Sequence, residues 1–235
     1  MSTSYNPIII ALDLDSADEA GRLVERLGDS VGIYKVGMEL YAAAGMEFVR
    51  KLISAGKQVF LDMKFYDIGE TVKRAAAQVA RSGVSFLTVH GSAAVMRAAV
   101  EGRGAGRLKL LGVTVLTSFD QTDLEDLGYP CPVRDLVALR ARKAMEAGLD
   151  GLVCSPQEVA EVRGITGPEA ILVTPGVRSA GASQGDQKRV ATPAEALRHG
   201  ASYLVIGRQV TRAADPRAEV FRICDEISGH VKMNL

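Results

Sequence analysis

The sequence lacks an excess of charge of either sign. Its 235 residues contain 28 Lys+Arg and 28 Asp+Glu, so the formal net charge is zero. Proteins that bind nucleic acids or anionic membranes nonspecifically need a broad basic surface, and this composition gives neither partner electrostatic support. We therefore expect neither nucleic acid nor membrane as a partner. Local binding of a phosphate group by a few basic residues remains open.

Long apolar runs and closely spaced cysteines are also missing. The longest apolar run near the N-terminus, Ile8 to Leu12, stops at Asp13 and is far shorter than the roughly 20 residues that a membrane span needs. No signal segment, basic and then apolar, precedes it. Cys131, Cys154 and Cys224 are odd in number and far apart, which favours ordinary thiols over a disulfide framework. These absences predict a cytoplasmic protein.

What the sequence does contain is a repeated alternation of apolar, β-rich segments with helical patterns. The expected strands are residues 7–14, 32–38, 58–65, 85–91, 109–117, 151–155, 170–177 and 202–208. Eight such units within this length predict an α/β fold with one domain, residues 1–235, closed into a TIM (β/α)8 barrel. A doubly wound open sheet is the alternative, which the lack of a GxGxxG fingerprint after the first strand disfavours. In a TIM barrel the active site lies at the carboxyl ends of the strands.

Local signals mark helix starts and two exceptional loops. Ser16 is placed to cap the first helix, and Thr192 with Pro193 opens the seventh, as N-cap and first-turn preferences predict. Residues 118–132 predict a long connection with a short helix of its own. Residues 178–189 predict a long polar loop, which in a compact domain is usually functional or mobile.

The third expected strand carries charged residues on one of its faces. Because side chains alternate along a strand, Val59 and Leu61 belong to a face that would pack on helices, whereas Asp62 and Lys64 point into the barrel mouth. Asp67 follows just beyond the strand. Ionised groups inside a barrel are costly unless they are paired. A structural salt-bridge network and a catalytic cluster are both possible explanations at this point.

Charges on two other strands favour the catalytic explanation. Asp13 ends the first strand and Lys35 lies on the second, so four charges are expected to converge at one rim, with Asp67 as a fifth. Such clusters in clefts are typical of catalytic sites. An ammonium flanked by carboxylates is stabilised in its charged form, so we expect Lys64 to act as an acid. That expectation disfavours Schiff-base chemistry, which needs a neutral amine.

A second group of residues predicts an anion site. Loops after strands seven and eight of such barrels often hold phosphate, and here they contain Pro175 to Arg178 and Gly207 followed by Arg208. Gly207 allows close approach to the backbone, and the Arg208 guanidinium matches phosphate oxygens. His90, at the end of the fourth strand, is a weaker candidate as a general base, because a lone histidine is more often a packed group. No spacing of ligand residues suggests a metal site.

Six segments, spread from the first strand to the eighth, carry a family resemblance. They are ALD at 11–13, KVGMEL at 35–40, LDMKFYDIGETV at 61–72, VTPGVR at 173–178, DQKRVATP at 186–193 and VIGR at 205–208. Together they resemble the orotidine 5′-phosphate decarboxylase family. The D-x-K-x-x-D element alone is shared with related sugar-phosphate decarboxylases. The resemblance implies a carboxy-lyase that converts orotidine 5′-monophosphate (OMP) to uridine 5′-monophosphate (UMP), the last step of de novo pyrimidine biosynthesis, without a cofactor.

The resemblance also implies roles for the matching positions. Lys64 would donate the proton, Asp62 would lie beside the scissile carboxylate, and Asp13 and Lys35 would bind ribose hydroxyls and complete the charge network. The loop over residues 178–189 would close as a lid. The other implied substrate contacts are Thr117 and Ser155 near the pyrimidine, and Pro175, Arg178, Gln187, Gly207 and Arg208 at the phosphate end.

A homodimer with shared sites follows from the same resemblance. The family places the last aspartate of its motif, here Asp67, in the neighbouring subunit's site, with Ile68 and Thr71 beside it. The catalytic set would thus be Lys35, Asp62, Lys64 and Asp67. Tyr66 stands where the bacterial pattern usually has His, and Gly69-Glu70 replaces the more familiar Pro-Asn or Pro-Thr. These departures concern the backbone shape of the loop more than the reaction.

Two other functions remain open on the sequence. A metal-dependent decarboxylase or aldolase of a keto-sugar phosphate would share Asp62, Lys64 and Asp67 and would need a divalent ion to hold an enediolate. Insensitivity to EDTA would distinguish OMP decarboxylation from it. A noncatalytic nucleotide-binding barrel would use the same charges only to bind a ligand, and would bind UMP tightly without turning OMP over.

Overall fold

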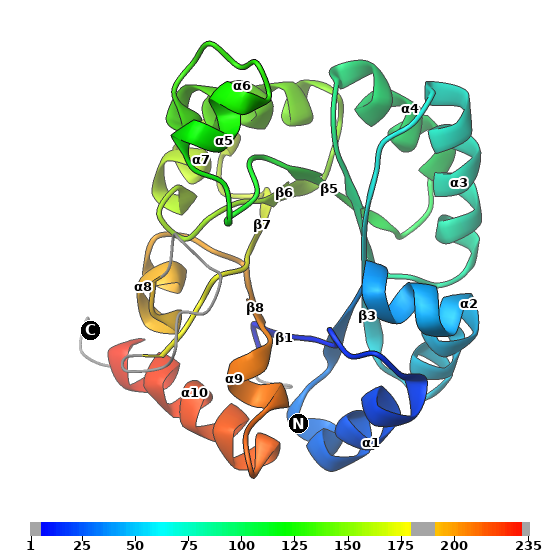
Figure 1. Ribbon diagram of the computed structural model, residues 1–235, viewed down its shortest axis with the longest axis vertical. Helices are drawn as coiled ribbons and strands as arrows, with labels where there is room; N and C mark the ends of the chain where they lie inside the picture. Colours follow the sequence, from blue (N-terminus) through cyan, green and yellow to red (C-terminus); the bar gives the residue numbers. More distant parts are fainter. Residues whose placement is uncertain (1–5, 180–190, 232–235) are drawn as a thin grey trace.

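Parallel strands paired in chain order close into a barrel in the computed structural model, which describes residues 6–179 and 191–231 (Figure 1). Each strand pairs with the next, and β8 pairs with β1 to complete the ring. The strands are β1 (Ile8–Ala11), β2 (Ile33–Gly37), β3 (Gln58–Phe65), β4 (Phe86–Val89), β5 (Lys109–Val113), β6 (Gly151–Val153), β7 (Ile171–Thr174) and β8 (Tyr203–Ile206). The TIM-barrel prediction is confirmed.

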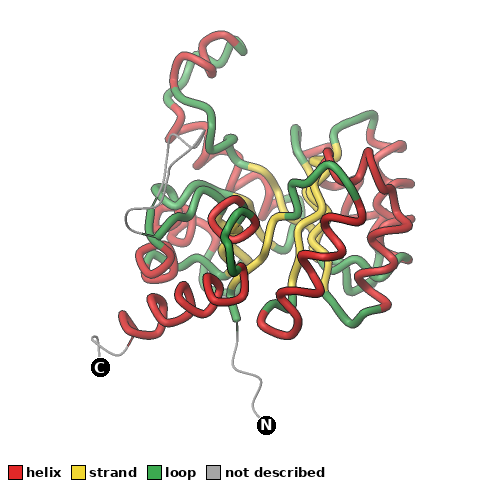
Figure 2. The backbone as a smooth tube through the Cα atoms, turned by 60° about the horizontal axis from the view of Figure 1, so that its bottom comes forward, coloured by secondary structure: helices red, strands yellow, loops and turns green. Residues whose placement is uncertain are grey.

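Helices cover the outside of the barrel, as Figure 2 shows with strands in yellow inside red helices. They are α1 (Ala17–Leu27), η1 (Gly28–Ser30), α2 (Met38–Ser54), α3 (Gly69–Arg81), α4 (Ala93–Arg103), α5 (Gln121–Asp126), α6 (Val133–Glu146), α7 (Val159–Thr166), α8 (Pro193–Arg198), α9 (Arg208–Thr211) and α10 (Pro216–Val231). No helix in the described part of the chain is both long and apolar enough to cross a membrane.

The expected capping residues begin their helices. The Ser16 side chain accepts a hydrogen bond from the Glu19 N–H at the start of α1. Thr192 and Glu195 form a reciprocal capping box at the start of α8, with Pro193 in the first turn, so backbone donors that the helix leaves open are satisfied. The short helix expected within residues 118–132 is α5.

Side chains that alternate along the strands build two apolar layers. One layer fills the barrel interior, and its members are Ile9, Ala11, Ile33, Phe60, Phe86, Leu111, Val173 and Val205. Val59 and Leu61 instead join the larger core between barrel and helices, as the alternation in β3 predicts. Phe60 therefore packs inside the barrel, and the next inward positions of β3 lie at its carboxyl end.

Candidate active site

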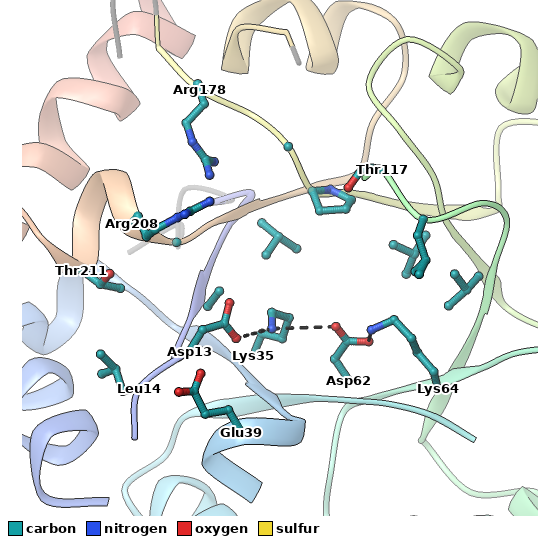
Figure 3. A pocket seen from close by; sticks show the side chains of 18 of the residues that line it. Asp13, Leu14, Lys35, Glu39, Asp62, Lys64, Thr117, Arg178, Arg208 and Thr211 are labelled. Carbon is teal, nitrogen blue, oxygen red and sulfur yellow. Dashed lines mark hydrogen bonds and ion pairs between the residues drawn. The ribbon is translucent and has the colours of Figure 1, made fainter. Parts of the chain in front are cut away.

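A cavity of about 660 Å³ lies at the carboxyl ends of the strands, the end at which TIM-barrel enzymes bind their substrates. Figure 3 shows a row of charged side chains from the end of β1 and from β2 and β3, and across from them Arg178, which follows β7, and Arg208, which begins α9. The predicted site residues that line the cavity are Asp13, Lys35, Asp62, Lys64, Thr117, Pro175, Arg178, Gly207 and Arg208. Glu39, Thr211 and Arg212 also line it, and the sequence patterns did not single them out.

Four charged side chains alternate in sign along the row. Lys35 Nζ lies 2.7 Å from Asp13 Oδ1 and 3.8 Å from Asp62 Oδ2. Lys64 Nζ lies 2.9 Å from Asp62 Oδ1. The Lys35 side chain is 10% exposed and that of Asp62 17%, so these charges are largely shielded from water and interact more strongly than surface pairs. We call these four residues the charge row.

Asp62 is held as a carboxylate by its neighbours. Burial alone would raise its pKa, but the charges of Lys35 and Lys64, together with hydrogen bonds from Lys64 and Thr88, lower the pKa below its ordinary value. An ionised Asp62 therefore separates the two ammonium groups. No three His, Cys, Asp or Glu side chains within residues 6–179 and 191–231 are grouped so that they could hold a metal ion.

Lys64 adopts a backbone conformation that a lysine rarely takes. Its φ is 47°, the single positive value at a non-glycine position within the described residues, and the register between β3 and β4 shifts at this point. The Lys64 N–H donates to Thr88 Oγ1 at 2.8 Å, and the same hydroxyl donates to Asp62 Oδ1 at 3.0 Å. Strained backbone of this kind costs of order 1–3 kcal/mol and is characteristic of functional sites.

Thr88 and Gly37 are site residues that the sequence reasoning missed. Thr88 is a fully buried polar residue on β4, and the alternation of inward side chains along that strand could have found it. Gly37 ends β2, and a Cβ placed there would lie 3.1 Å from Lys35 Nζ and 3.2 Å from Asp13 Oδ1. The absence of a side chain at Gly37 leaves room for the Lys35–Asp13 pair.

The arginines across the cavity form its second charged region. Arg178 is half-buried, and burial together with the nearby Arg208 guanidinium lowers the pKa of Arg178. Arg178 Nη1 donates to its neighbouring carbonyl, Val177 O, at 2.7 Å. An anion bound between the two guanidinium groups would offset the effect of the Arg208 charge on Arg178. This end of the cavity therefore suits a phosphate group.

Other predicted residues lie away from the cavity of their own chain. Asp67 and Thr71 are exposed, and Ile68 is 76% exposed. The chain turns outward after β3, where Asp67 Oδ1 accepts a hydrogen bond from the Ile68 N–H at 2.6 Å, so Asp67 does not join the charge row as a fifth charge. Ser155 is fully buried and does not line the cavity, and its hydroxyl accepts a hydrogen bond from the Gln157 N–H at 3.4 Å. Gln187 and most of the expected lid lie outside the described residues.

His90 is packed against a neighbouring ring. The His90 and Tyr66 ring centroids lie 6.0 Å apart in an edge-to-face arrangement, and His90 does not line the cavity. Burial, with smaller contributions from the charges of Arg140 and Lys64, lowers the pKa of His90. This environment favours a neutral packed imidazole.

Comparison with protein families gives one match over nearly the whole chain. Residues 6–223 match the family model described as orotidine 5′-phosphate decarboxylase / HUMPS family. A protein from Rhodopseudomonas palustris (strain TIE-1) named orotidine 5′-phosphate decarboxylase is 55% identical over 221 residues, which are 94% of this chain and 93% of that protein. A protein of the same name from Caulobacter sp. (strain K31) is 52% identical over 222 residues, 94% of this chain and 97% of that one.

Two solved structures resemble this fold over nearly the whole of each chain. The crystal structure of orotidine 5′-phosphate decarboxylase from Lactobacillus acidophilus has a TM-score of 0.83 and 36% identity, and the match covers 95% of this chain and 99% of that one. An uncharacterized conserved protein from Geobacillus kaustophilus has a TM-score of 0.82 and 38% identity, over 94% of this chain and 100% of that one.

Proposed function

The chain belongs to the orotidine 5′-phosphate decarboxylase / HUMPS family, and from this premise we propose that it converts OMP to UMP and carbon dioxide, the last step of de novo UMP biosynthesis. The observation that carries the proposal is the position of Lys64, whose Nζ lies 2.9 Å from Asp62 Oδ1 in the cavity that Arg178 and Arg208 also line. The substrate carries a carboxylate that leaves and a phosphate that does not. A lysine–aspartate pair and an arginine pair in one cavity suit these two groups.

The proposed binding mode follows from this pairing. The phosphate lies between Arg178 and Arg208, and the pyrimidine carboxylate lies beside Asp62. The distance between the two ends of the cavity is spanned by the ribose, whose hydroxyls bind Asp13 and Lys35. Binding energy from the remote phosphate then helps to hold the reacting carbon against the charge row.

The proposed chemical step uses one proton and no external acceptor of electrons. The bond from C6 to the carboxylate carbon breaks, carbon dioxide leaves, and the electron pair stays on C6. Lys64 Nζ donates a proton to C6 and becomes a neutral amine, which takes up a proton from solvent before the next turnover. Asp62, whose pKa is lowered by Lys35 and Lys64 against the effect of burial, is ionised next to the departing carboxylate. Its repulsion of that group would weaken when carbon dioxide leaves.

Lys64 alone is not sufficient for such a reaction. An ammonium about 4 Å from the carbanion contributes about 4 kcal/mol at an effective dielectric constant near 20. A slow reaction can require about 20 kcal/mol of barrier lowering. The remainder must come from charges that are already oriented before the substrate binds, and from exclusion of water. The hydrogen bonds that fix Lys64 and Asp62 through Thr88 support such preorganisation.

We further propose a homodimer in which Asp67, Ile68 and Thr71 reach the partner's cavity. Ile68 and Tyr66 are 76% and 69% exposed, and a partner subunit would remove these apolar surfaces from water. The Asp67 carboxylate is exposed on the same loop. A shared site of this kind would make each cavity complete only in the dimer.

Mixing two inactive variants tests the shared site. If Lys64 acts in its own subunit and Asp67 in the partner's, Lys64→Ala and Asp67→Asn proteins are each inactive, but their heterodimer contains one intact site. Reassembled mixtures should then regain about a quarter of the wild-type activity, as expected for random pairing of subunits in a two-fold dimer. A mixture that stays inactive although heterodimers form would contradict the shared site.

A cytoplasmic location is also proposed. It is supported by the three cysteines, Cys131, Cys154 and Cys224, whose odd number and wide spacing in the sequence favour ordinary thiols over a disulfide framework. Unpaired thiols are stable in a reducing compartment.

The proposed function is tested by the loss of OMP absorbance with purified protein in excess EDTA. We expect turnover at the same rate with and without the chelator. Turnover of a keto-sugar phosphate that EDTA abolishes would favour the metal-dependent alternative. Tight binding of UMP with no turnover of OMP would favour a nucleotide-binding protein and refute the decarboxylase.

A further inference from the structure

One side chain joins the two segments that carry the cavity arginines. Gln209 Oε1 accepts a hydrogen bond from the Ser179 N–H at 3.1 Å, and Gln209 Nε2 donates to Ser179 Oγ at 2.9 Å. Ser179 is 3% exposed, so water competes little for these bonds. The amide thus holds the segment after β7 against the start of α9. We call this pair of hydrogen bonds the Gln209–Ser179 clasp.

The orientation of the amide is fixed by its partners. The Ser179 N–H needs an acceptor, so it faces Oε1. The second hydrogen on Gln209 Nε2 donates to Glu219 Oε1 on α10 at 2.9 Å. Glu219 is itself held by two bonds from Arg222, at 2.6 and 2.9 Å. Reversal of the amide would place Oε1 against a carboxylate and Nε2 against an N–H donor, so the network allows one orientation.

The clasp lies directly beside both arginines in the sequence. Ser179 follows Arg178, and Gln209 follows Arg208. Arg178 lies in the segment after β7 and Arg208 is the first residue of α9, and burial followed by the charge of Arg208 lowers the pKa of Arg178. Their mutual repulsion would separate them before an anion binds. A bond between the adjacent residues opposes that separation.

We infer that Gln209 is a positioning residue that sets the separation of Arg178 and Arg208 for the phosphate of the substrate. This inference rests on the proposed function for the identity of the ligand. Gln209 does not line the cavity, so it acts through the arginines and not by contact with the phosphate. It should therefore affect phosphorylated ligands and leave the rest of the site unchanged.

Two variants test the clasp at different strengths. Gln209→Ala removes all three bonds of the amide, and we expect KM for OMP and the dissociation constant of UMP to rise about tenfold, equivalent to about 1.4 kcal/mol. Ser179→Ala removes only the bond to the hydroxyl, so a smaller rise in both constants is expected. Uridine, which lacks the phosphate, should bind both variants as it binds the wild type. kcat at saturating OMP should change much less than KM.

A charge exchange provides a rescue experiment. Gln209→Glu places a second carboxylate against Glu219 and should weaken UMP binding at least as much as Gln209→Ala. In the double variant Gln209→Glu with Glu219→Gln, the amide and the carboxylate exchange places, so the amide now at position 219 donates to the carboxylate now at position 209. We expect the affinity for UMP to recover. Glu226→Gln is the matched control, because Glu226 also pairs with Arg222, at 3.9 Å, and the change removes a carboxylate one helical turn beyond Arg222 while Glu219 stays in place. The control should bind UMP as the wild type does.

Ribose 5-phosphate separates this inference from the proposed function. Its binding can be measured by calorimetry without turnover, and Gln209→Ala should weaken it by the same factor as UMP. A wild-type protein that does not turn over OMP refutes the decarboxylase but leaves that comparison intact. Equal loss of affinity for uridine and UMP, or unchanged affinity of Gln209→Ala for ribose 5-phosphate, would overturn the positioning role. A lower melting temperature with unchanged affinities would also overturn it.

Discussion

Gly37→Ala is predicted to damage the charge row without damaging the fold. The added Cβ would lie 3.1 Å from Lys35 Nζ and 3.2 Å from Asp13 Oδ1, both closer than an ordinary contact. The φ of Gly37 is −94°, which alanine adopts without strain. The ends of two side chains must therefore move while the backbone can stay in place.

The size of the effect follows from the ion pair. If the Lys35–Asp13 distance of 2.7 Å lengthens to about 3.5 Å, the pair weakens by about 1.4 kcal/mol at an effective dielectric constant of 20. The Asp13 side chain is 56% exposed, and solvent screening reduces the loss to about 1 kcal/mol. That energy corresponds to about a fivefold loss of kcat/KM for OMP.

The matched control is Gly32→Ala, just before the same strand. A Cβ at Gly32 has nothing within 4 Å, so this variant measures the effect of an alanine near β2 without contact with the charge row. We expect wild-type kinetics for Gly32→Ala and a similar melting temperature for both variants. Equal kcat/KM for the two variants, or a crystal structure of Gly37→Ala with the ion pair unchanged, would refute the reasoning.

Three further predictions follow from individual contacts. Thr88→Val keeps the shape of the side chain but removes its hydrogen bonds to Asp62 and Lys64, so kcat should fall about tenfold. Thr88→Ser keeps the hydroxyl and should retain most of the wild-type rate. A fully active Thr88→Val would contradict the role of the hydroxyl. Burial acts to raise the pKa of Asp62, but the charges of Lys35 and Lys64 outweigh it, so the folded-state pKa is below the ordinary value. The ionised carboxylate therefore stabilises the folded protein at pH values above its unfolded-state pKa of about 3.9. This stabilisation is lost as the pH falls through the lower folded-state pKa. The difference between wild type and Asp62→Asn in the free energy of unfolding, measured with urea, should therefore shrink below about pH 4, and a difference that grows there would have the wrong sign. Arg163→Ala removes bonds to the carbonyls of Gly167, Ala170 and Gly200, far from the cavity, so the free energy of unfolding should fall by about 2 kcal/mol with kcat/KM unchanged.

The barrel and all four residues of the charge row could be predicted from the sequence because both depend on periodicity. Apolar segments that alternate with helical patterns indicate parallel strands covered by helices, and alternation within β3 separates Asp62 from Val59 and Leu61. The strands are mostly shorter than their apolar segments. The apolar segments are longer because hydrophobic residues continue beyond the last hydrogen bonds between neighbouring strands, where the chain already turns toward the next helix.

Features that depend on contacts between distant segments could not be predicted in this way. The positive φ of Lys64 coincides with the register shift between β3 and β4, which neither strand reveals alone. The Gln209–Ser179 clasp joins residues 30 positions apart through side chains with no periodic pattern. Asp67 follows the charged strand closely in sequence, but the outward turn after Phe65 separates it from the charge row within one chain.

OMP turnover and UMP binding, both measured on Lys64→Ala, separate the chemical role of Lys64 from substrate binding. If the Lys64 ammonium stabilises the carbanion and protonates C6, the variant should show no detectable turnover while it still binds UMP, because Arg178 and Arg208 are unchanged. Substantial turnover by Lys64→Ala would rule out Lys64 as the proton donor.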